Sequence, residues 1–309
     1  MAELAPSQQA GSFNLGFAGD TFNTAWYLAR IAAEIEVSYL TAVGDDAISD
    51  DMRAFIRASG ISDKHVRPIP GETVGLYLIH LDNGERSFSY WRDRSAARQL
   101  ALDPAFLETA IEEADLIYYS GITLAILDAQ SRENLFRALR RGRDLGKIVA
   151  FDTNLRPRLW SSTIEMTDTI MRAAAQSDIV LPSFDDEAEW FGDASSLATL
   201  DRYAECGVAR IVVKNSAQPV VFQQAGQRGE VQVAPATNVV DTTAAGDSFN
   251  AGVLAGILLQ DDLAAGVRDG CQLASQVVRH KGALVPVDID RDRQAEWVGS
   301  AAPEGTKRP

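Results

Sequence analysis

The sequence is poor in cysteine, in histidine and in positive charge. Its 309 residues include 2 Cys and 3 His, and neither Cys206 nor Cys271 belongs to a C-x-x-C pair. We therefore expect no disulfide framework and no structural zinc site, and a reducing cytoplasm is the simplest location for two isolated thiols. The excess of 43 acidic over 29 basic residues gives a net charge of -14. This charge argues against nucleic acids and anionic membranes as partners, because their phosphates would be repelled.

Long apolar runs are also absent, and none of the runs present is long enough to span a membrane. The segment 1–11 lacks both a basic start and an apolar stretch, so we expect no signal peptide. Hydrophobic residues nevertheless make up 46% of the chain. That content is enough for one large buried core, and we expect 1–309 to form a single domain.

Strand-like apolar runs alternate with helical patterns along most of the chain. This alternation predicts an α/β fold with a mostly parallel sheet covered on both faces. We expect strands at 37–43, 116–120, 148–152, 178–181 and 209–214, and helices at 47–59, 128–144, 163–175, 185–191, 245–259 and 263–281. The polar tail after Asp290 is expected to be loose.

The segment from about 65 to 94 interrupts this alternation. Two alternating, aromatic-rich stretches, 73–81 and 86–91, flank an Asp-Asn-Gly-Glu turn. An Asn-Gly turn between such stretches is typical of a β-hairpin. We expect a small β excursion that stands off the main sheet and acts as a lid.

The segment 241–252, Asp-Thr-Thr-Ala-Ala-Gly-Asp-Ser-Phe-Asn-Ala-Gly, is the most informative one. Small residues run directly into an apolar helix, so a ligand can approach the backbone closely. The first amides of a helix lack internal partners and favour negative charge, which makes this an anion site. Asp247 inside it is suited to accept a proton from a hydroxyl that attacks a phosphoryl group. An acid that merely complements the helix dipole is the alternative interpretation.

This segment resembles the C-terminal signature of the phosphofructokinase B (PfkB) sugar kinases, D-T-x-G-A-G-D. Here Ala244 replaces the usual first glycine, a variant similar to the one in the family's 2-keto-3-deoxygluconate kinases. The resemblance implies that Asp247 is the catalytic base. It also implies that Ala244, Ala245 and Gly246 supply the amides of the anion hole.

A second segment, 16–25, precedes an expected helix and contains Gly19, Asp20 and Asn23. Taken alone, it is equally well read as a helix capped by Asp20 or Thr21. It also resembles the G-G-x-x-x-N-x-A segment of the PfkB kinases, with Ala18 in place of the first glycine. The resemblance implies that Gly19, Asp20 and Asn23 bind sugar hydroxyls.

Three further segments, 75–77, 84–92 and 151–160, resemble the family members that act on the sugar acid 2-keto-3-deoxygluconate. A carboxylate needs a cationic partner, and arginine offers a bidentate fork, which makes Arg92 and Arg156 the candidates. The resemblance implies that Tyr77, Tyr90 and Arg92 line the substrate pocket. Asn154 and Arg156 follow an expected strand, where α/β folds place ligand sites, and Arg156 is expected to face the sugar acid, the phosphates or both.

The nucleotide side has weaker signals. The segment 214–217 resembles the family's K-x-G-x-x-G turn without its glycines, which implies ATP contacts near Lys214 and Ser216, together with Ala245, Gly246 and Asn154. Glu187 matches the acid of the family's N-x-x-E motif, which implies a role in organising magnesium. Glu187 is equally well read as a first-turn helix acid.

Taken together, the resemblance implies a ribokinase-like three-layer α/β/α sandwich with a small β lid, and a kinase that uses ATP and Mg²⁺ on 2-keto-3-deoxygluconate. A kinase for a neutral ketose such as fructose and a non-catalytic sugar-acid binding protein are the alternatives. An aromatic hairpin is also typical of a contact surface, so we expect a homo-oligomer, a dimer through the lid. Family members begin with a strand that precedes the segment matching Met1–Leu4, and we expect that strand to be missing from the sheet.

Overall fold

The computed structural model describes residues 1–309 except 8, 10, 83–84, 235 and 288–309. The polar tail expected after Asp290 therefore lies outside the described residues. Within the described part, no helix combines the length and the apolar character needed to cross a membrane.

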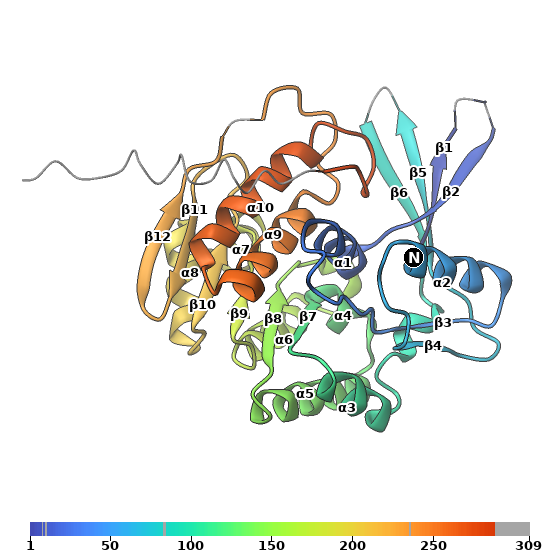
Figure 1. Ribbon diagram of the computed structural model, residues 1–309, viewed down its shortest axis with the longest axis horizontal. Coiled ribbons are helices and arrows are strands. Elements are labelled where there is room, and N and C mark those ends of the chain that lie inside the picture. The colour runs from blue at the N-terminus through green and yellow to red at the C-terminus, as the bar shows by residue number, and fades with distance from the viewer. Residues whose placement is uncertain (8, 10, 83–84, 235, 288–309) are drawn as a thin grey trace, which may run out of the picture.

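The centre of the molecule is a six-stranded sheet in the order β12-β11-β10-β9-β8-β7 (Figure 1). The four strands from β7 to β10 are parallel, and β11 and β12 continue the sheet antiparallel. Their bounds are β7 Leu116–Ser120, β8 Ile148–Asp152, β9 Ile179–Val180, β10 Arg210–Val213, β11 Val220–Gln224 and β12 Gln227–Val231. The predicted mostly parallel sheet is confirmed.

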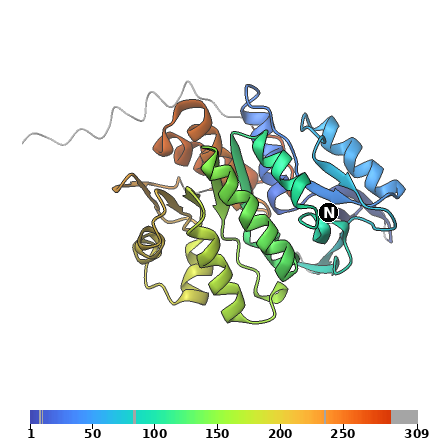
Figure 2. The ribbon, with the colours of Figure 1, turned by 90° about the horizontal axis from the view of Figure 1, so that it is seen from below.

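Helices cover both faces of this sheet, as Figures 1 and 2 show from two directions. Successive strand residues point to opposite faces: Val149 and Phe151 pack in one buried cluster with α3, α5, α6 and α8, whereas Ala150 packs in another with α9 and α10. Because these strands carry apolar side chains on both faces, helices must cover each face, which gives the three-layer α/β/α arrangement. The helices are α1 Asp20–Ile31, α2 Ala47–Ala58, α3 Pro104–Glu112, α4 Gly121–Ile126, α5 Ala129–Asp144, α6 Thr163–Ala174, α7 Phe184–Phe191, α8 Ser196–Glu205, α9 Ala245–Gln260 and α10 Leu263–Val277, with short 3₁₀ turns at Ala96–Gln99 and Pro157–Leu159.

A second sheet, the lid, stands apart from the first and has the order β2-β1-β5-β6 (Figure 1). Its strands are β1 Ala2–Pro6, β2 Phe13–Phe17, β5 Leu76–Asp82 and β6 Glu85–Trp91. The expected hairpin is β5–β6, and its turn at 83–84 lies outside the described residues. The lid is larger than the 65–94 segment alone, because β1 pairs with β5 and brings β2 with it.

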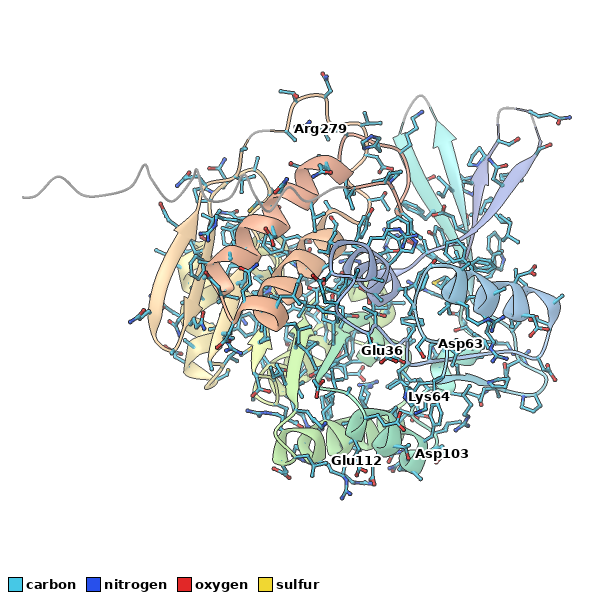
Figure 3. All side chains as sticks on the ribbon, viewed as in Figure 1. Glu36, Asp63, Lys64, Asp103, Glu112 and Arg279 are labelled. Atoms are coloured by element: carbon cyan, nitrogen blue, oxygen red, sulfur yellow. The ribbon has the colours of Figure 1, made fainter. Side chains whose placement is uncertain are left out.

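The start of the 65–94 segment does not join the lid. Instead, β4 Val66–Pro68 pairs in parallel with β3 Thr41–Val43 in a separate two-stranded sheet. Ion pairs attach this sheet to α3 and its surroundings, Arg67 with Asp103 at 3.2 Å and Lys64 with Glu113 at 2.6 Å. Figure 3 shows Lys64 and Asp103 at this edge of the molecule. Only Thr41–Val43 of the expected strand 37–43 is regular strand.

Close backbone packing fixes the start of α9. A Cβ atom added at Gly252 would lie 2.4 Å from the backbone nitrogen of Gly270 on α10. Such a distance is closer than a side chain permits, so glycine is required where α9 and α10 cross. The helix that carries the 241–252 segment is thereby held rigidly against its neighbour.

Candidate active site

An open cavity of about 1420 Å³ lies between the lid, the first turns of α1 and α9, and the carboxyl ends of β7 and β8. It also runs along the side of β7 that has no strand partner in the described part of the chain, beside β3. Most of the expected site residues line this one cavity: Gly19, Asp20, Asn23, Tyr77, Tyr90, Arg92, Asn154, Arg156, Lys214, Ala244, Gly246 and Asp247. Segments far apart in the sequence therefore meet at one place, where open α/β folds bind ligands.

The loop before α9 has a distinctive backbone. Ala244 is the N-cap residue and adopts the left-handed conformation, with φ 59°, which explains why glycine suits this position. Asp241 holds the preceding turn by accepting hydrogen bonds from the Thr243 amide at 3.1 Å and the Gly282 amide at 2.8 Å.

The amides of this turn are not equivalent. The Ala245 amide donates to the Thr242 carbonyl at 3.2 Å, so it is already partnered. In the described part of the chain, the amides of Ala244, Gly246 and Asp247 have no such bond. The amides left open for an anion at this helix start are therefore those of Ala244, Gly246 and Asp247, whereas the Ala245 amide is occupied.

Asp247 lies in the first turn of α9 and is fixed by Asn23 on α1. The Asn23 side-chain nitrogen donates to Asp247 Oδ2 at 2.7 Å, and Asn23 Oδ1 accepts from the Gly19 amide at 3.0 Å. Gly19 has φ 142°, a conformation that favours glycine. The three residues that the sequence assigned to one site thus form one chain of hydrogen bonds.

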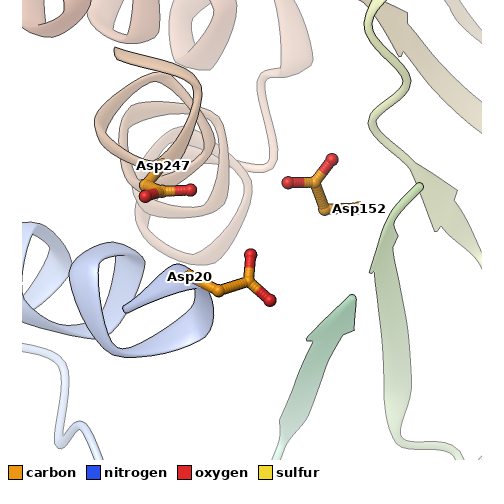
Figure 4. A group of neighbouring side chains, drawn as sticks. All are labelled: Asp20, Asp152 and Asp247. Carbon is orange, nitrogen blue, oxygen red and sulfur yellow. The ribbon is translucent and has the colours of Figure 1, made fainter. Parts of the chain in front are cut away.

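Three carboxylates converge in the site, as Figure 4 shows for Asp20, Asp152 and Asp247. One oxygen of each lies within 4.8 Å of the others. Burial, reinforced by the charge of Asp20, raises the pKa of Asp247 to about 7. Burial and the charge of Asp152 raise the pKa of Asp20 to about 6, against hydrogen bonds from Ser120 and Asn154 that lower it. A carboxylate with a pKa near neutrality is well suited to act as a general base.

The lid and the 151–160 segment supply the cationic side of the cavity. The Arg92 guanidinium lies 4.3 Å from the centre of the Tyr90 ring, and the Tyr77 and Tyr90 rings are tilted against each other with their centres 6.0 Å apart. Arg156 is half exposed and lies 3.6 Å from a carboxylate oxygen of Asp186. Burial lowers the pKa of Arg92, and the positive charge of Arg156 adds to this effect. The two guanidinium groups therefore lie near each other in the wall of the cavity.

Three expected residues do not line the cavity, namely Ala245, Ser216 and Glu187. Ser216 is exposed and donates to Asp185 Oδ2 at 2.7 Å. Glu187 is fully buried beneath the site, where its carboxylate accepts hydrogen bonds from Thr153 at 2.8 Å, Tyr203 at 2.9 Å and Arg202 at 2.7 Å. The acid that α7 presents to the cavity is its neighbour Asp186, whose pKa burial raises.

The sequence interpretation missed a second group of site residues, Asp152, Tyr118 and Asn250. The Asn250 side-chain nitrogen donates to Asp152 at 2.9 Å and to the Tyr118 hydroxyl at 3.0 Å. A signal was present for two of them, because Asp152 ends an apolar strand and Asn250 follows Asp247 by one helical turn. Tyr118 reads as an ordinary residue of a buried strand.

The chain belongs to the pfkB family of carbohydrate kinases, whose profile matches residues 2–290. It is 40% identical over 276 residues to the 2-dehydro-3-deoxygluconokinase of Haemophilus influenzae, covering 87% of this chain and 88% of that protein. It is 37% identical over 296 residues to the enzyme of the same name from Dickeya dadantii, covering 93% and 95%. The crystal structure of a PfkB protein from Polaromonas sp. JS666 superposes with a TM-score of 0.79, at 25% identity and 97% coverage of both chains. The expected ribokinase-like fold and the expected family are confirmed.

Proposed function

We propose that this protein transfers the γ-phosphoryl group of ATP to the terminal hydroxyl of 2-keto-3-deoxygluconate (2-dehydro-3-deoxygluconate). The observation that carries the proposal is the position of Asp247. It is a buried carboxylate with a raised pKa, next to open helix amides, in a cavity that Arg92 and Arg156 also line. The relatives named 2-dehydro-3-deoxygluconokinase support the same substrate.

In this reaction Asp247 accepts the proton of the sugar hydroxyl as its oxygen attacks the γ-phosphorus. A bond forms between that oxygen and phosphorus, the bond from phosphorus to the β-phosphate oxygen breaks, and ADP leaves. The amides of Gly246 and Asp247 stabilise the charge on the transferred phosphoryl group. Asn23 orients Asp247, and Arg92 and Arg156 hold the substrate carboxylate by charge-assisted hydrogen bonds.

The residues around the nucleotide side fit a magnesium ion that arrives with ATP. Magnesium prefers oxygen ligands and keeps several waters, so one or two nearby carboxylates suffice. Asp186 faces the cavity and offers such an oxygen. Glu187 acts behind it, because its bond to Thr153 holds the turn that contains Asn154. When bound, magnesium would neutralise the nucleotide phosphates.

The outer face of the lid suits a dimer. The strand register places Leu15, Leu4 and Leu78 in one row, on the face opposite the cavity-facing Tyr77 and Tyr90. Leu15 is 49% exposed, and Trp91 on the same face is 58% exposed. Apolar side chains gathered on one sheet face indicate a contact surface. A Leu15→Glu variant should sediment as a smaller species than the unmodified protein; an unchanged sedimentation coefficient would remove the lid from the interface.

The test of the function is ADP release with magnesium-ATP and a panel of acceptors, 2-keto-3-deoxygluconate, fructose and ribose. Turnover on the keto acid is expected to be much faster than turnover on fructose or ribose. Faster turnover on fructose would indicate a neutral ketose kinase instead. An Asp247→Asn variant should lose nearly all turnover while still binding the sugar acid in calorimetry. Turnover close to that of the unmodified protein would remove Asp247 from the role of base.

A further inference from the structure

A buried lysine lies directly beside the anion-binding turn. Lys214 follows β10 and is only 9% exposed, yet it lines the cavity. Its ammonium group donates to Asp152 Oδ1 at 3.0 Å and to Asn250 Oδ1 at 3.1 Å. The resemblance implied only that Lys214 lies near the nucleotide. The structure shows that Asp152 and Asn250 hold its ammonium group in the wall of the cavity.

The ammonium group has one donor left. A lysine ammonium carries three hydrogens, and Asp152 and Asn250 accept two of them; no third acceptor is found in the described part of the chain. A Cβ atom added at Gly246 would lie 3.9 Å from Lys214 Nζ. The remaining donor thus lies close to Gly246, whose open amide lines the same cavity as that of Asp247.

Asp152 and Asn250 are themselves tied together. Asn250 donates to Asp152 and to the Tyr118 hydroxyl, so its amide cannot rotate without losing both bonds. A buried ion pair of this kind contributes little to stability, since desolvation offsets the attraction between the charges. What the arrangement does provide is a fixed position for one positive charge.

We propose that the Lys214 ammonium group is a catalytic donor to the γ-phosphoryl group, and that Asp152 and Asn250 are positioning residues that act through it. This inference rests on the proposed phosphoryl transfer. The phosphoryl oxygens would receive the third hydrogen of Lys214 together with the amides of Gly246 and Asp247. As the γ-phosphoryl group leaves the β-phosphate, negative charge develops on their oxygens. The Lys214 ammonium is already in position to stabilise this charge, so the protein does not have to rearrange during the reaction.

The first experiment compares Lys214→Met with Lys147→Met, a matched change at a lysine that immediately precedes β8, at the end of the strands away from the cavity. Lys214→Met is expected to lower kcat by about 10²- to 10³-fold, the usual effect of losing one such donor. Its Kd for 2-keto-3-deoxygluconate should stay within about threefold, and Lys147→Met should match the unmodified protein. A kcat within about threefold for Lys214→Met would overturn the inference.

A second measurement needs no sugar substrate. Lys214→Met should bind ATP about tenfold more weakly while its Kd for ADP is unchanged, because only ATP carries the γ-phosphoryl group. If the unmodified protein does not turn over the sugar acid but this contrast holds, the proposed substrate fails and the role of Lys214 stands. Equal losses for ATP and ADP would count against the γ-phosphoryl contact.

The positioning role has its own test. Asp152→Asn should lower kcat by about tenfold or more, and the double variant with Lys214→Met should be no slower than Lys214→Met alone, since both changes remove one interaction. Additive losses would show that Asp152 acts independently of Lys214. If Lys214→Met unfolds, Lys214→Ala assayed with added methylammonium replaces it. Recovery of kcat by the amine, absent in the unmodified protein, is expected, and no recovery in a folded Lys214→Ala would contradict the proposal.

Discussion

Asn23 on α1 donates a hydrogen bond of 2.7 Å to Asp247 on α9, although 224 residues separate them in the sequence. This bond stabilises the charged form of Asp247 and lowers its pKa, against the burial that raises it. An Asn23→Ala variant should therefore need a higher pH to ionise Asp247. We expect the acid limb of kcat/KM to move up by about one pH unit, a change of about 1.4 kcal/mol. A downward shift or none would contradict the assignment.

Asp20 has the opposite effect on the same group. Its negative charge is the largest contribution to the raised pKa of Asp247 after burial. In Asp20→Asn, Asp247 should ionise at lower pH, and the acid limb of kcat/KM should move down. Asp152, which raises the pKa of Asp247, and Lys214, which lowers it, are unchanged in both variants. Titration of ATP is common to all profiles, so the difference between the variants is the quantity to measure.

The sequence predicted the parts of this site that local motifs carry. The strands at 116–120 and 148–152 and the helix at 163–175 lie within a residue of where they were expected, because apolar runs and caps act over a few residues. The motifs also brought Asp20, Asn23 and Asp247 to one site. The Asn23–Asp247 bond itself depends on how α1 packs against α9, which no single segment encodes.

The misses share a physical cause, which is contact between distant segments. The segment of about 65–94 was expected to form most of the lid, but its first strand, β4, pairs with β3. Strand β1 joins the lid by pairing with β5, which the sequence did not predict. Glu187 was expected to organise magnesium, and that role stays a proposal. Its carboxylate turns inward because Arg202 of α8 lies beneath α7. The expected absence of a first strand also stays a prediction.

Burying Asp247 should make the protein less stable at alkaline pH. Its folded-state pKa of about 7 lies above the ordinary aspartate value of 3.8, so the folded state binds more protons between these pH values and stability falls as pH rises through them. At 1.36 kcal/mol per unit, the cost above pH 7 is on the order of 4 kcal/mol. Asp247→Asn should raise Tm at pH 8.5 by several degrees, and the gain should shrink towards pH 5. An equal gain at both values would point to a cause other than charge.

If Arg92 and Arg156 bind the substrate carboxylate, their removal should weaken the binding of a sugar acid but leave the turnover of a neutral sugar unchanged. Arg92→Leu and Arg156→Leu each remove a cation that faces the cavity, and the loss of a charge-assisted hydrogen bond costs about 1.5–3 kcal/mol. The KM for 2-keto-3-deoxygluconate should rise by about tenfold or more in each variant. The slow turnover of fructose, which has no carboxylate, serves as the internal control and should not change. Equal losses on both sugars would mean that the arginines shape the pocket rather than bind the acid.

Ala244 occupies a left-handed position that most side chains avoid. The left-handed conformation costs an L-residue about 1–2 kcal/mol, whereas glycine loses about 0.4–1 kcal/mol through the greater freedom of its unfolded chain. Ala244→Gly should therefore be neutral or stabilise the protein slightly, with kcat preserved. Ala244→Val, β-branched at φ 59°, should lower Tm by several degrees and weaken ATP binding, because the turn that presents the Gly246 and Asp247 amides would relax. Thermal unfolding and nucleotide titration of the pair check this; a Val variant as stable and active as Gly would show that the backbone here is not constrained.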